Sequence, residues 1–255
     1  MNQAKRLALG LTAATVIGTT GAAMVPIPAT ATATATPAAP VPALRASAAG
    51  GGQQVAVLTR TTQALAGPAS GSAVVETVAG NRPITGEQTT LPVTARVSDA
   101  HGGRWLRVLL PGRPNGHSGW IGAGSSTAAG ADWQIVISTS RRQVRVLWHG
   151  RVARIFRAVV GKPSTPTPLG SFFVEESVKL DGGDPGAPYA LALSARSNVL
   201  QEFDGGPGQI AIHGIDNVGG VPGTAVSHGC IRVSTRAVTW LADEVGPGSR
   251  VTITA

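Results

Sequence analysis

From residue 53 to the C-terminus, the chain consists mainly of short stretches in which apolar and polar residues alternate. Alternation with a period of two is typical of strands that bury one face. In the first part of this region the alternating stretches are VAVLTR (55–60), LPVTARV (91–97), WLRVLL (105–110) and GWIGA (119–123). Gly, Pro and Asn residues between the last two mark tight turns. The pattern predicts a small β unit over residues 53–126.

A second series of alternating stretches begins near Asp132. Its predicted strands are WQIVIST (133–139), QVRVLWHG (143–150), RVARIFRAVVG (151–161), TPLGSFFVEE (167–176), YALALS (189–194), QIAIHG (209–214) and SRVTIT (249–254). One helix is expected over residues 236–245, with Ser234 or Thr235 as its N-cap and a Gly-Pro-Gly sequence after its end. The whole chain is therefore predicted to be mainly β with one short helix.

The first 52 residues differ in composition from the rest. Lys5 and Arg6 precede an uncharged apolar stretch, and Ala-x-Ala sites follow it, as in a secretory signal peptide over residues 1–25. An uncleaved membrane anchor is the alternative, because the stretch is nearly long enough to span a bilayer. Residues 26–52 are rich in Ala, Pro and Thr and predict an unfolded linker. Both interpretations place the remainder outside the cytoplasm, secreted or associated with the cell wall or periplasm, and only the anchor would bring membrane contact.

The charge and the cysteine content exclude some classes of function. The 255 residues carry a formal net charge of +8 that is scattered rather than clustered, and only 4% of them are aromatic. Nucleic-acid binding, which uses basic stripes and stacked aromatic rings, is not expected. A scattered positive charge suits an anionic polymer such as a cell wall. Cys230 is the only cysteine, so the chain has no internal disulfide, and its thiol is buried, joined between chains or used chemically.

Two of the five histidines lie in the same short segment as this cysteine. His213 ends an alternating strand, and SHGC (227–230) follows after a loop rich in Gly and Pro. A catalytic thiol needs a neighbouring base and backbone donors for the oxyanion that forms when it attacks a carbonyl. Gly229 would let the chain turn tightly and expose its N–H groups. We expect His213 to reach Cys230 if the loop folds back, with a backbone carbonyl fixing its tautomer.

Other interpretations of these residues stay open. Cys230 is an inert buried residue in one of them, and in another His228, two positions before it, is the base. A zinc site formed by His213, His228 and Cys230 would lack a further ligand at a suitable spacing, so no metal is expected. The remaining histidines, His101, His117 and His149, lie in turn-rich segments and are interpreted as solvated loop residues. The Gly-rich segment 181–188 lacks the lysine and helix of a phosphate loop and suits a mobile flap near the site.

The pair formed by HG (213–214) and SHGCIR (227–232) resembles the signature of L,D-transpeptidases of the YkuD family. The upstream stretch GKPSTPTPLGSFFV (161–174) is similar to the family's second recurring stretch, and the resemblance extends over residues 132–255. It implies a β-sandwich-like catalytic domain. The resemblance assigns Cys230 as the nucleophile and His213 as the general base and acid, with the Gly214 carbonyl orienting His213. It also assigns Ser227, His228 and Gly229 to the pocket or the oxyanion site, and Arg232 to substrate binding. Tyr189 is a further candidate for substrate contact, although a packed strand residue explains it better.

The stretch RWLRVLLPGRPNGHSGWIGA (104–123) resembles the end of bacterial SH3-like domains, which implies a small barrel over residues 53–126. Trp105 and Trp120 are interpreted as core residues of this barrel, and ligand stacking is the alternative. Because the unit contains no nucleophile–base pair, we expect it to be dispensable for chemistry and to contribute localisation.

The family resemblance implies a peptidoglycan L,D-transpeptidase. Such an enzyme forms a thioester with a donor tetrapeptide stem, passes the acyl group to the amine of an acceptor stem and joins the third residues of the two stems. It needs no cofactor, and the resemblance implies acylation of the same cysteine by carbapenems. The alternatives are an L,D-carboxypeptidase that trims stem peptides and a non-catalytic wall-binding protein.

Overall fold

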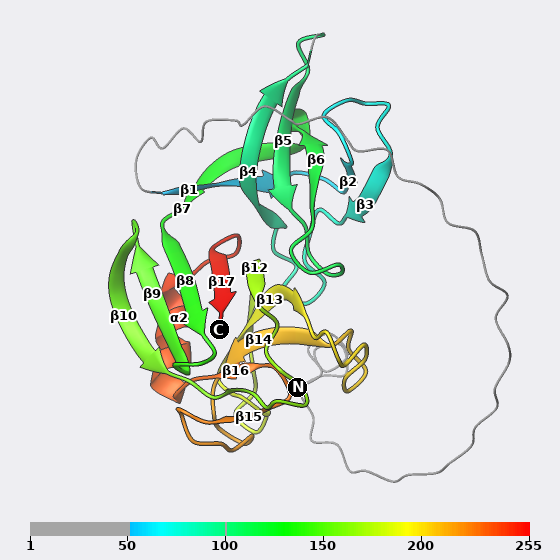
Figure 1. Cartoon of the computed structure of the whole chain (residues 1–255). Helices are drawn as coiled ribbons and strands as arrows, with labels where there is room; N and C mark the ends of the chain where they lie inside the picture. The colour runs from blue at the N-terminus through cyan, green and yellow to red at the C-terminus, as the bar shows by residue number, and fades with distance from the viewer. Residues whose placement is uncertain (1–51, 100) are drawn as a thin grey trace, which may run out of the picture.

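The computed structural model describes residues 52–99 and 101–255, which form two β units, one above the other in Figure 1. The expected signal peptide or anchor over residues 1–25 lies outside the described residues, as does the expected linker apart from Gly52. Within the described ranges, no helix has the length and apolar character needed to cross a membrane.

The N-terminal unit is a seven-stranded sheet with the order β3-β2-β6-β5-β4-β1-β7. Its strands are β1 (Gln53–Leu58), β2 (Thr62–Leu65), β3 (Val74–Val78), β4 (Thr90–Ser98), β5 (Arg104–Leu109), β6 (Ser118–Gly122) and β7 (Ser126–Ala131), with a short 3-10 helix, η1 (Ala123–Ser125), before β7. Strand β7 pairs with β1 from Gln53↔Ala131 to Leu58↔Ser126, so the unit runs past the boundary expected at residue 126. The sequence of β7, STAAGA, has only small residues and therefore shows no alternation.

The two tryptophans of this unit do not form its core, contrary to the interpretation made from the sequence. The buried cluster consists of Ala56, Leu58, Ala64, Val78, Leu91, Val93, Val108, Leu110, Ile121 and Phe173. Trp105 and Trp120 are only half-buried, and Trp105 Nε1 donates a hydrogen bond to Asp99 Oδ2 at 2.8 Å. Because Ile121 faces the core, strand alternation places the adjacent Trp120 on the other face of the sheet.

The second unit contains an eight-stranded sheet with the order β10-β9-β8-β17-β12-β13-β14-β16 and a two-stranded sheet formed by β11 and β15. The strands are β8 (Trp133–Ser138), β9 (Gln143–Trp148), β10 (Arg151–Arg157), β11 (Val160–Gly161), β12 (Gly170–Lys179), β13 (Tyr189–Arg196), β14 (Gln209–His213), β15 (Ala225–Ser227), β16 (Ile231–Arg232) and β17 (Arg250–Thr254). Most pairs are antiparallel, whereas β8–β17, β11–β15 and β14–β16 are parallel. The chain is thus mainly β, as predicted.

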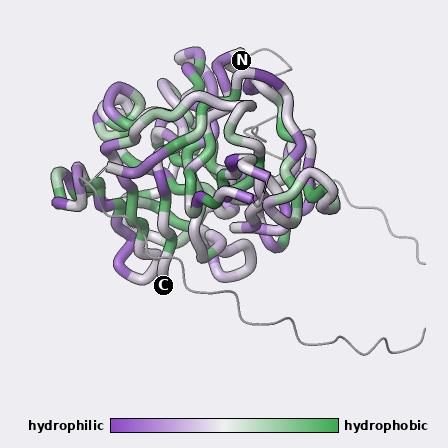
Figure 2. The backbone as a smooth tube through the Cα atoms, turned by 90° about the horizontal axis from the view of Figure 1, so that it is seen from above, coloured by the Kyte–Doolittle hydropathy of each residue, from purple (hydrophilic) through white to green (hydrophobic). Residues whose placement is uncertain are grey.

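Helix α2 (Thr235–Glu244) covers one face of this sheet. Ser234 is its N-cap and accepts a hydrogen bond from the Ala237 amide at 3.3 Å, which satisfies one of the unpaired N–H groups of the first turn. Val238 and Leu241 lie on its inner side and join the main buried cluster of the unit. Figure 2 shows many hydrophobic segments in the interior of the molecule and many hydrophilic segments in its outer parts.

Strand β12 contributes to the cores of both units. Phe172 belongs to the buried cluster of the second unit, and the next residue, Phe173, belongs to that of the N-terminal unit. Successive side chains of a strand point to opposite faces, so this strand is a shared wall. At the same junction, Gln53 Nε2 donates to the Gly248 carbonyl at 2.9 Å. The two units are therefore packed against each other through a continuous apolar contact.

Candidate active site

The candidate nucleophile and base lie on one face of two adjacent strands. Strands β14 and β16 pair in parallel, with Ile212 opposite Ile231 and His213 opposite Arg232. Ile212 and Ile231 both face the main core of the unit. Because side chains alternate, His213 projects from the opposite face, and Cys230, one residue before β16, packs with the apolar cluster on that opposite face. The two residues that the sequence analysis singled out therefore lie on the same face of two adjacent strands.

His213 is held as a neutral ring with a defined tautomer. Its side chain is buried, and Nδ1 lies 2.7 Å from the Gly214 carbonyl oxygen. Because a carbonyl only accepts hydrogen bonds, Nδ1 carries the proton and Nε2 is the basic nitrogen. Burial lowers the pKa of His213 to about 4, with the bond to Gly214 opposing this shift and the charge of Arg232 adding to it. At neutral pH the ring is therefore available as a proton acceptor.

Cys230 is held as a protonated thiol. Its Sγ lies 4.0 Å from the Gln209 carbonyl oxygen, a weak hydrogen bond for a thiol. Burial raises the pKa of Cys230, and a backbone hydrogen bond at Ala211 and the positive charge of Arg232 only partly oppose this shift. The resting pair of Cys230 and His213 is consequently a neutral thiol beside a neutral imidazole.

Ser227 shapes the turn that presents the thiol. It is fully buried, its Oγ donates to the Cys230 carbonyl at 2.6 Å and accepts from the Gly229 amide at 3.2 Å. Gly229 has a φ of +124°, and a Cβ at this position would lie 2.9 Å from Ile210 Cδ1. A side chain at residue 229 would therefore be strained in conformation and in space.

The second recurring stretch of the sequence wraps around this turn. The Lys162 amide donates to the Ser227 carbonyl at 2.9 Å. The Thr167 hydroxyl accepts from the Gly161 amide at 2.9 Å and donates to the Gly229 carbonyl at 2.8 Å. The two motifs are thus one structural unit, in which residues 161–167 hold the backbone of SHGC in place.

His228 points away from this buried turn. Its side chain is exposed, Nε2 lies 3.3 Å from Lys162 Nζ, and its ring contacts that of Phe203 with centroids 5.3 Å apart. Partial burial is the main cause that lowers the pKa of His228, followed by the charges of Lys162 and Arg232. The sequence analysis missed both Lys162 and Phe203. Lys162 lies in the quoted second stretch, whereas nothing in the sequence around Phe203 marks it.

Two loops close around His213. Arg232 Nη1 donates to the carbonyls of Val218 and Gly219 at 3.0 and 3.1 Å, which holds the loop after β14. In the expected flap over residues 181–188, the Gly186 carbonyl accepts from the Gly214 amide at 2.8 Å. Gly186 has a φ of +81°, and a Cβ there would lie 2.3 Å from His213 Nδ1. This segment is consequently in direct contact with the candidate base.

Tyr189 and the remaining histidines lie elsewhere. Tyr189 packs against the main core. His101 and His149 are exposed, as expected, but His117 is not a solvated loop residue. Its Nε2 lies 2.9 Å from Glu76 Oε2, because the turn between β5 and β6 folds against β3, a strand that the sequence did not reveal. Within the described ranges, no three His, Cys, Asp or Glu side chains are grouped to hold a metal ion.

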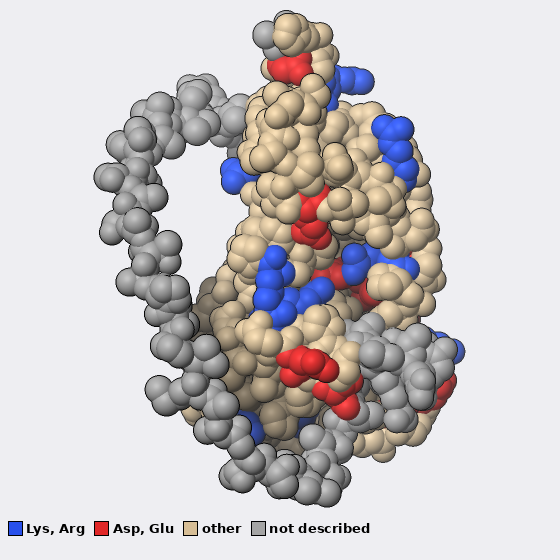
Figure 3. Space-filling model, turned by 90° about the vertical axis from the view of Figure 1, so that its right-hand side faces the viewer, with Lys and Arg blue, Asp and Glu red and all other residues tan. Residues whose placement is uncertain are grey.

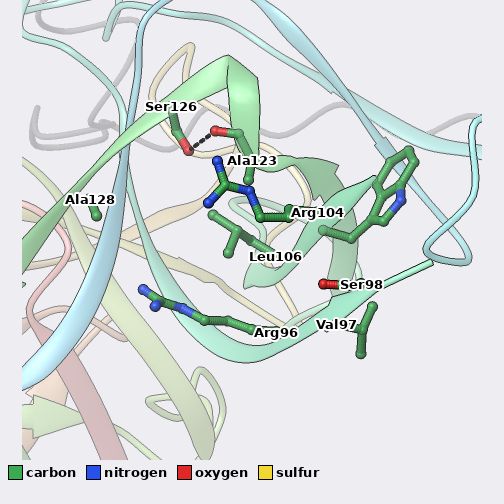
Figure 4. Close-up of a pocket in the computed structure, with 9 residues that line it drawn as sticks. Arg96, Val97, Ser98, Arg104, Leu106, Ala123, Ser126 and Ala128 are labelled. Atoms are coloured by element: carbon green, nitrogen blue, oxygen red, sulfur yellow. Dashed lines mark hydrogen bonds between the residues drawn. The ribbon is translucent and has the colours of Figure 1, made fainter. Parts of the chain in front are cut away.

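A separate hollow of about 400 Å³ lies on the N-terminal unit (Figure 4). Its lining includes Arg96 and Arg104, with Leu106 drawn between them, and it also includes Trp105. Within the part of the chain that the structure describes, neither arginine forms an ion pair with an acidic side chain. The hollow contains neither Cys230 nor His213, so it is distinct from the candidate active site.

Comparison with known proteins identifies the second unit. The sequence profile of the L,D-transpeptidase catalytic domain (YkuD) matches residues 132–253. A Bacillus licheniformis protein assigned by name to the L,D-transpeptidases (YkuD) is 32% identical over 155 residues, which are 58% of this chain and 86% of that protein. The chain belongs to the L,D-transpeptidase family. Its members are cysteine-dependent acyltransferases, so the chain is an enzyme of this class.

Other members of the family share less of the chain. L,D-transpeptidase 1 of Mycobacterium tuberculosis is 32% identical over 130 residues, which are 46% of this L,D-transpeptidase and 49% of the relative. A crystal structure of an L,D-transpeptidase from the same organism is 16% identical, with a TM-score of 0.45, and covers 78% of this chain and 96% of its own.

Proposed function

We propose that this L,D-transpeptidase cross-links peptidoglycan through a thioester on Cys230, with His213 as general base and acid. The observation that supports the proposal is the parallel pairing of β14 with β16, in which His213 and Cys230 share the face opposite the main core. The bond from His213 Nδ1 to the Gly214 carbonyl supports it, because it leaves Nε2 free to take a proton.

In the first step, the thiol sulfur attacks the carbonyl of the third residue of a donor tetrapeptide stem while its proton passes to His213 Nε2. The tetrahedral intermediate then collapses, the peptide bond to the terminal D-Ala breaks, and the leaving amine takes the proton from His213. A thioester remains on Cys230. Splitting the exchange into two displacements avoids a single difficult step.

Stabilisation of the oxyanion falls to backbone amides in this proposal. The Gly229 amide is already bonded to Ser227 Oγ, so it does not point freely toward a substrate. Among the described residues, none accepts a hydrogen bond from the Cys230 amide. We assign the Cys230 N–H as a donor to the oxyanion, with Ser227 and Gly229 fixing its direction.

In the second step, the side-chain amine of an acceptor stem attacks the thioester and gives its proton to His213. The C–S bond breaks, the thiol is restored, and an amide joins the third residues of the two stems. Water in place of the amine would give an L,D-carboxypeptidase with the same two residues. The two activities differ in how well the site excludes water.

Substrate contacts are proposed for the basic side chains near the nucleophile. Arg232 carries its charge close to Cys230, and Lys162 and His228 meet at the exposed side of the same turn. Together they suit the carboxylates of a stem peptide. Tyr189, which packs against the main core, keeps only a proposed role in the shape of the site.

Intact-mass measurement of acylation, with a carbapenem and with a tetrapeptide stem, tests the central proposal. Cys230→Ala should abolish both adducts. His213→Ala should slow acylation by about 10²–10⁴-fold and leave a reactivity that rises toward high pH as thiolate forms unaided. His228→Ala is the matched control and should keep the wild-type pH profile. If His228→Ala shows the displaced profile instead, His213 is not the base.

We also propose that the N-terminal unit is an SH3-like domain that binds an anionic component of the cell wall, and that the enzyme acts outside the cytoplasm. The hollow lined by Arg96 and Arg104 supports this role, because guanidinium groups bind carboxylates and phosphates in a bidentate fashion. Cosedimentation with purified peptidoglycan should fall for a variant with both arginines changed to Ala. Arg60→Ala, which removes an exposed arginine outside the hollow, should bind as the wild type does. Equal binding by all three proteins would refute this role.

A further inference from the structure

One residue of the N-terminal unit packs against the same apolar cluster as the candidate nucleophile. The sheet face that carries Cys230 is covered by a small apolar cluster. Its buried members are Val178, Leu180, Ala187, Ala190, Ala192 and Ala211. Two partly buried residues pack against this cluster, Cys230 itself and Ile84, which lies in the N-terminal unit between β3 and β4. We call residues 80–88 the Ile84 loop.

The Ile84 loop is fastened to β12 on both sides of Ile84. Arg82 Nη2 forms an ion pair with Glu175 Oε2, and Arg82 Nε lies 3.9 Å from Glu176 Oε1. The backbone amide and the hydroxyl of Thr85 both donate to Glu176 Oε2, each at 3.1 Å. Two residues, Arg82 before Ile84 and Thr85 after it, therefore bind two carboxylates of the catalytic unit.

These carboxylates are deeply buried. Glu175 and Glu176 are each 1% exposed, although they are consecutive residues of one strand. The pairing of β12 with β13 shifts register between Val174 and Glu176, and this bulge lets both side chains turn inward. Arg196 Nη2, on β13, pairs with Glu175 Oε1 at 3.1 Å. Figure 3 shows basic and acidic side chains side by side where the two units meet.

Such a cluster fixes the loop firmly. Burial raises the pKa of Glu175, while the charges of Arg196 and Arg82 lower it, so the charged form depends on both arginines. Removing one partner of a buried ion pair leaves an uncompensated charge in a medium of low dielectric. If the loop left the catalytic unit, Glu175 and Glu176 would lose Arg82 as their partner. The contact is therefore a permanent part of the structure.

The sheet face that carries Cys230 has small side chains, which fill little of the space around the thiol. Ala190, Ala192 and Ala211 carry only a methyl group each, so a larger side chain must fill the space above them. Ile84 is one of the larger side chains that pack against this cluster. We propose that the Ile84 loop is part of the active site and that Ile84 is a positioning residue, which holds the apolar wall against Cys230 and keeps water from it. This inference rests on the proposed role of Cys230, and it opposes the expectation that residues 53–126 are dispensable for chemistry.

The test compares full-length wild type with Ile84→Ala. We expect acylation by a carbapenem to slow by about 10-fold or more, because small displacements of reacting groups carry large costs in rate. Alkylation of Cys230 by iodoacetamide should shift to lower pH, because water that enters the vacated space stabilises the thiolate. Ile84→Val should show the same two effects on a smaller scale. Because unfolding would also expose the thiol to iodoacetamide, both reactions are measured under conditions in which circular dichroism shows that Ile84→Ala is folded.

Arg113→Ala is the matched control, because it weakens the junction of the units at another place. Arg113 donates to the carbonyls of Ser197, Leu200 and Pro207 at 2.9, 3.1 and 2.9 Å, and none of these residues belongs to the apolar cluster. We expect this variant to acylate at nearly the wild-type rate.

The proposal is overturned if Ile84→Ala acylates and alkylates like the wild type, or if Arg113→Ala is slowed equally. Should Ile84→Ala not fold, Ile84→Val decides, and wild-type behaviour in both reactions overturns the proposal. Failure of the wild type to acylate would instead refute the proposed function. In that case the alkylation profile of Ile84→Ala would still test whether Ile84 keeps water from Cys230.

Discussion

Acidification should destabilise this enzyme through His213. The pKa of the ring is 6.5 in an unfolded chain and about 4 in the folded protein. Between these values the unfolded chain binds a proton that the folded protein does not bind, so the free energy of unfolding falls as pH falls. The stabilisation is complete above pH 6.5 and is lost progressively down to about pH 4. With 1.36 kcal/mol for each pH unit, the loss attributable to His213 is ~3 kcal/mol.

Urea unfolding at a series of pH values between 7.5 and 4.5 measures this loss. The quantity to compare is the difference in unfolding free energy between wild type and His213→Gln, which removes the titrating ring. Glu175, whose raised pKa in the folded state gives a pH dependence of opposite sign, is present in both proteins and cancels. The difference should be constant above pH 6.5 and should shrink below it. His149→Gln, at an exposed position, should follow the wild type. Parallel curves for wild type and His213→Gln would refute the reasoning.

Three further substitutions test the packing and the substrate contacts. Phe173→Ala should lower the free energy of unfolding by about 3–5 kcal/mol, because this ring belongs to the core between the units. Calorimetry should show a single unfolding transition at a lower temperature, and two separate transitions would contradict the shared core. Thr167→Val removes the hydrogen bond to the Gly229 carbonyl and should slow acylation while the pH profile of the rate stays the same. An unchanged rate would contradict a positioning role for Thr167. Lys162→Ala should raise the KM for a stem peptide with free carboxylates while kcat stays the same, and an equal effect on a fully amidated stem would contradict carboxylate binding.

The sequence predicts strands in stretches where apolar and polar residues alternate, among them the largely exposed β10, and misses strands that lack this pattern. The alternation in residues 133–139 and 143–150 corresponds to β8 and β9. Strand β7 consists of small and polar residues, and its position is set by pairing with β1 rather than by its own pattern. Strands β11 and β16 have only two residues each, too few for any period to appear. Long-range pairing, which no local window contains, decides these elements.

The residues of the candidate site likewise include some that the sequence indicates and others that only the structure reveals. Residue type and spacing offer Cys230 as a candidate nucleophile with His213 or His228 as its base, and the family resemblance favours His213. Ile84 could not be found, since an isoleucine in a loop carries no chemical signal and its partners are 94 or more residues away. Glu175 and Glu176 look like ordinary strand residues in the sequence, and only the bulge in β12 shows that both are buried.

The protonation states of the resting pair constrain how the first step proceeds. The pKa of Cys230 is raised from an ordinary value of 9.0, and that of His213 is lowered to about 4. Transfer of the proton from sulfur to nitrogen in the free enzyme therefore costs about 7 kcal/mol or more before the attraction between the two new charges is counted. A stored thiolate–imidazolium pair is consequently disfavoured. Proton transfer is expected to accompany the attack on the carbonyl, when the developing charge moves to the oxyanion.

A solvent isotope experiment separates these two routes. If the proton moves during attack, acylation by a carbapenem should be slower in D2O by about twofold at saturating reagent, because transfer to His213 Nε2 contributes to the barrier. In His213→Ala at high pH, where free thiolate attacks, the isotope effect should disappear, so this variant is the internal control. The rate of the wild type should also change little between pH 6.5 and 8, since neither group titrates in that range. An isotope effect of one in the wild type, together with a rate that rises with thiolate concentration, would show that Cys230 attacks as a preformed thiolate and that burial does not control its reactivity.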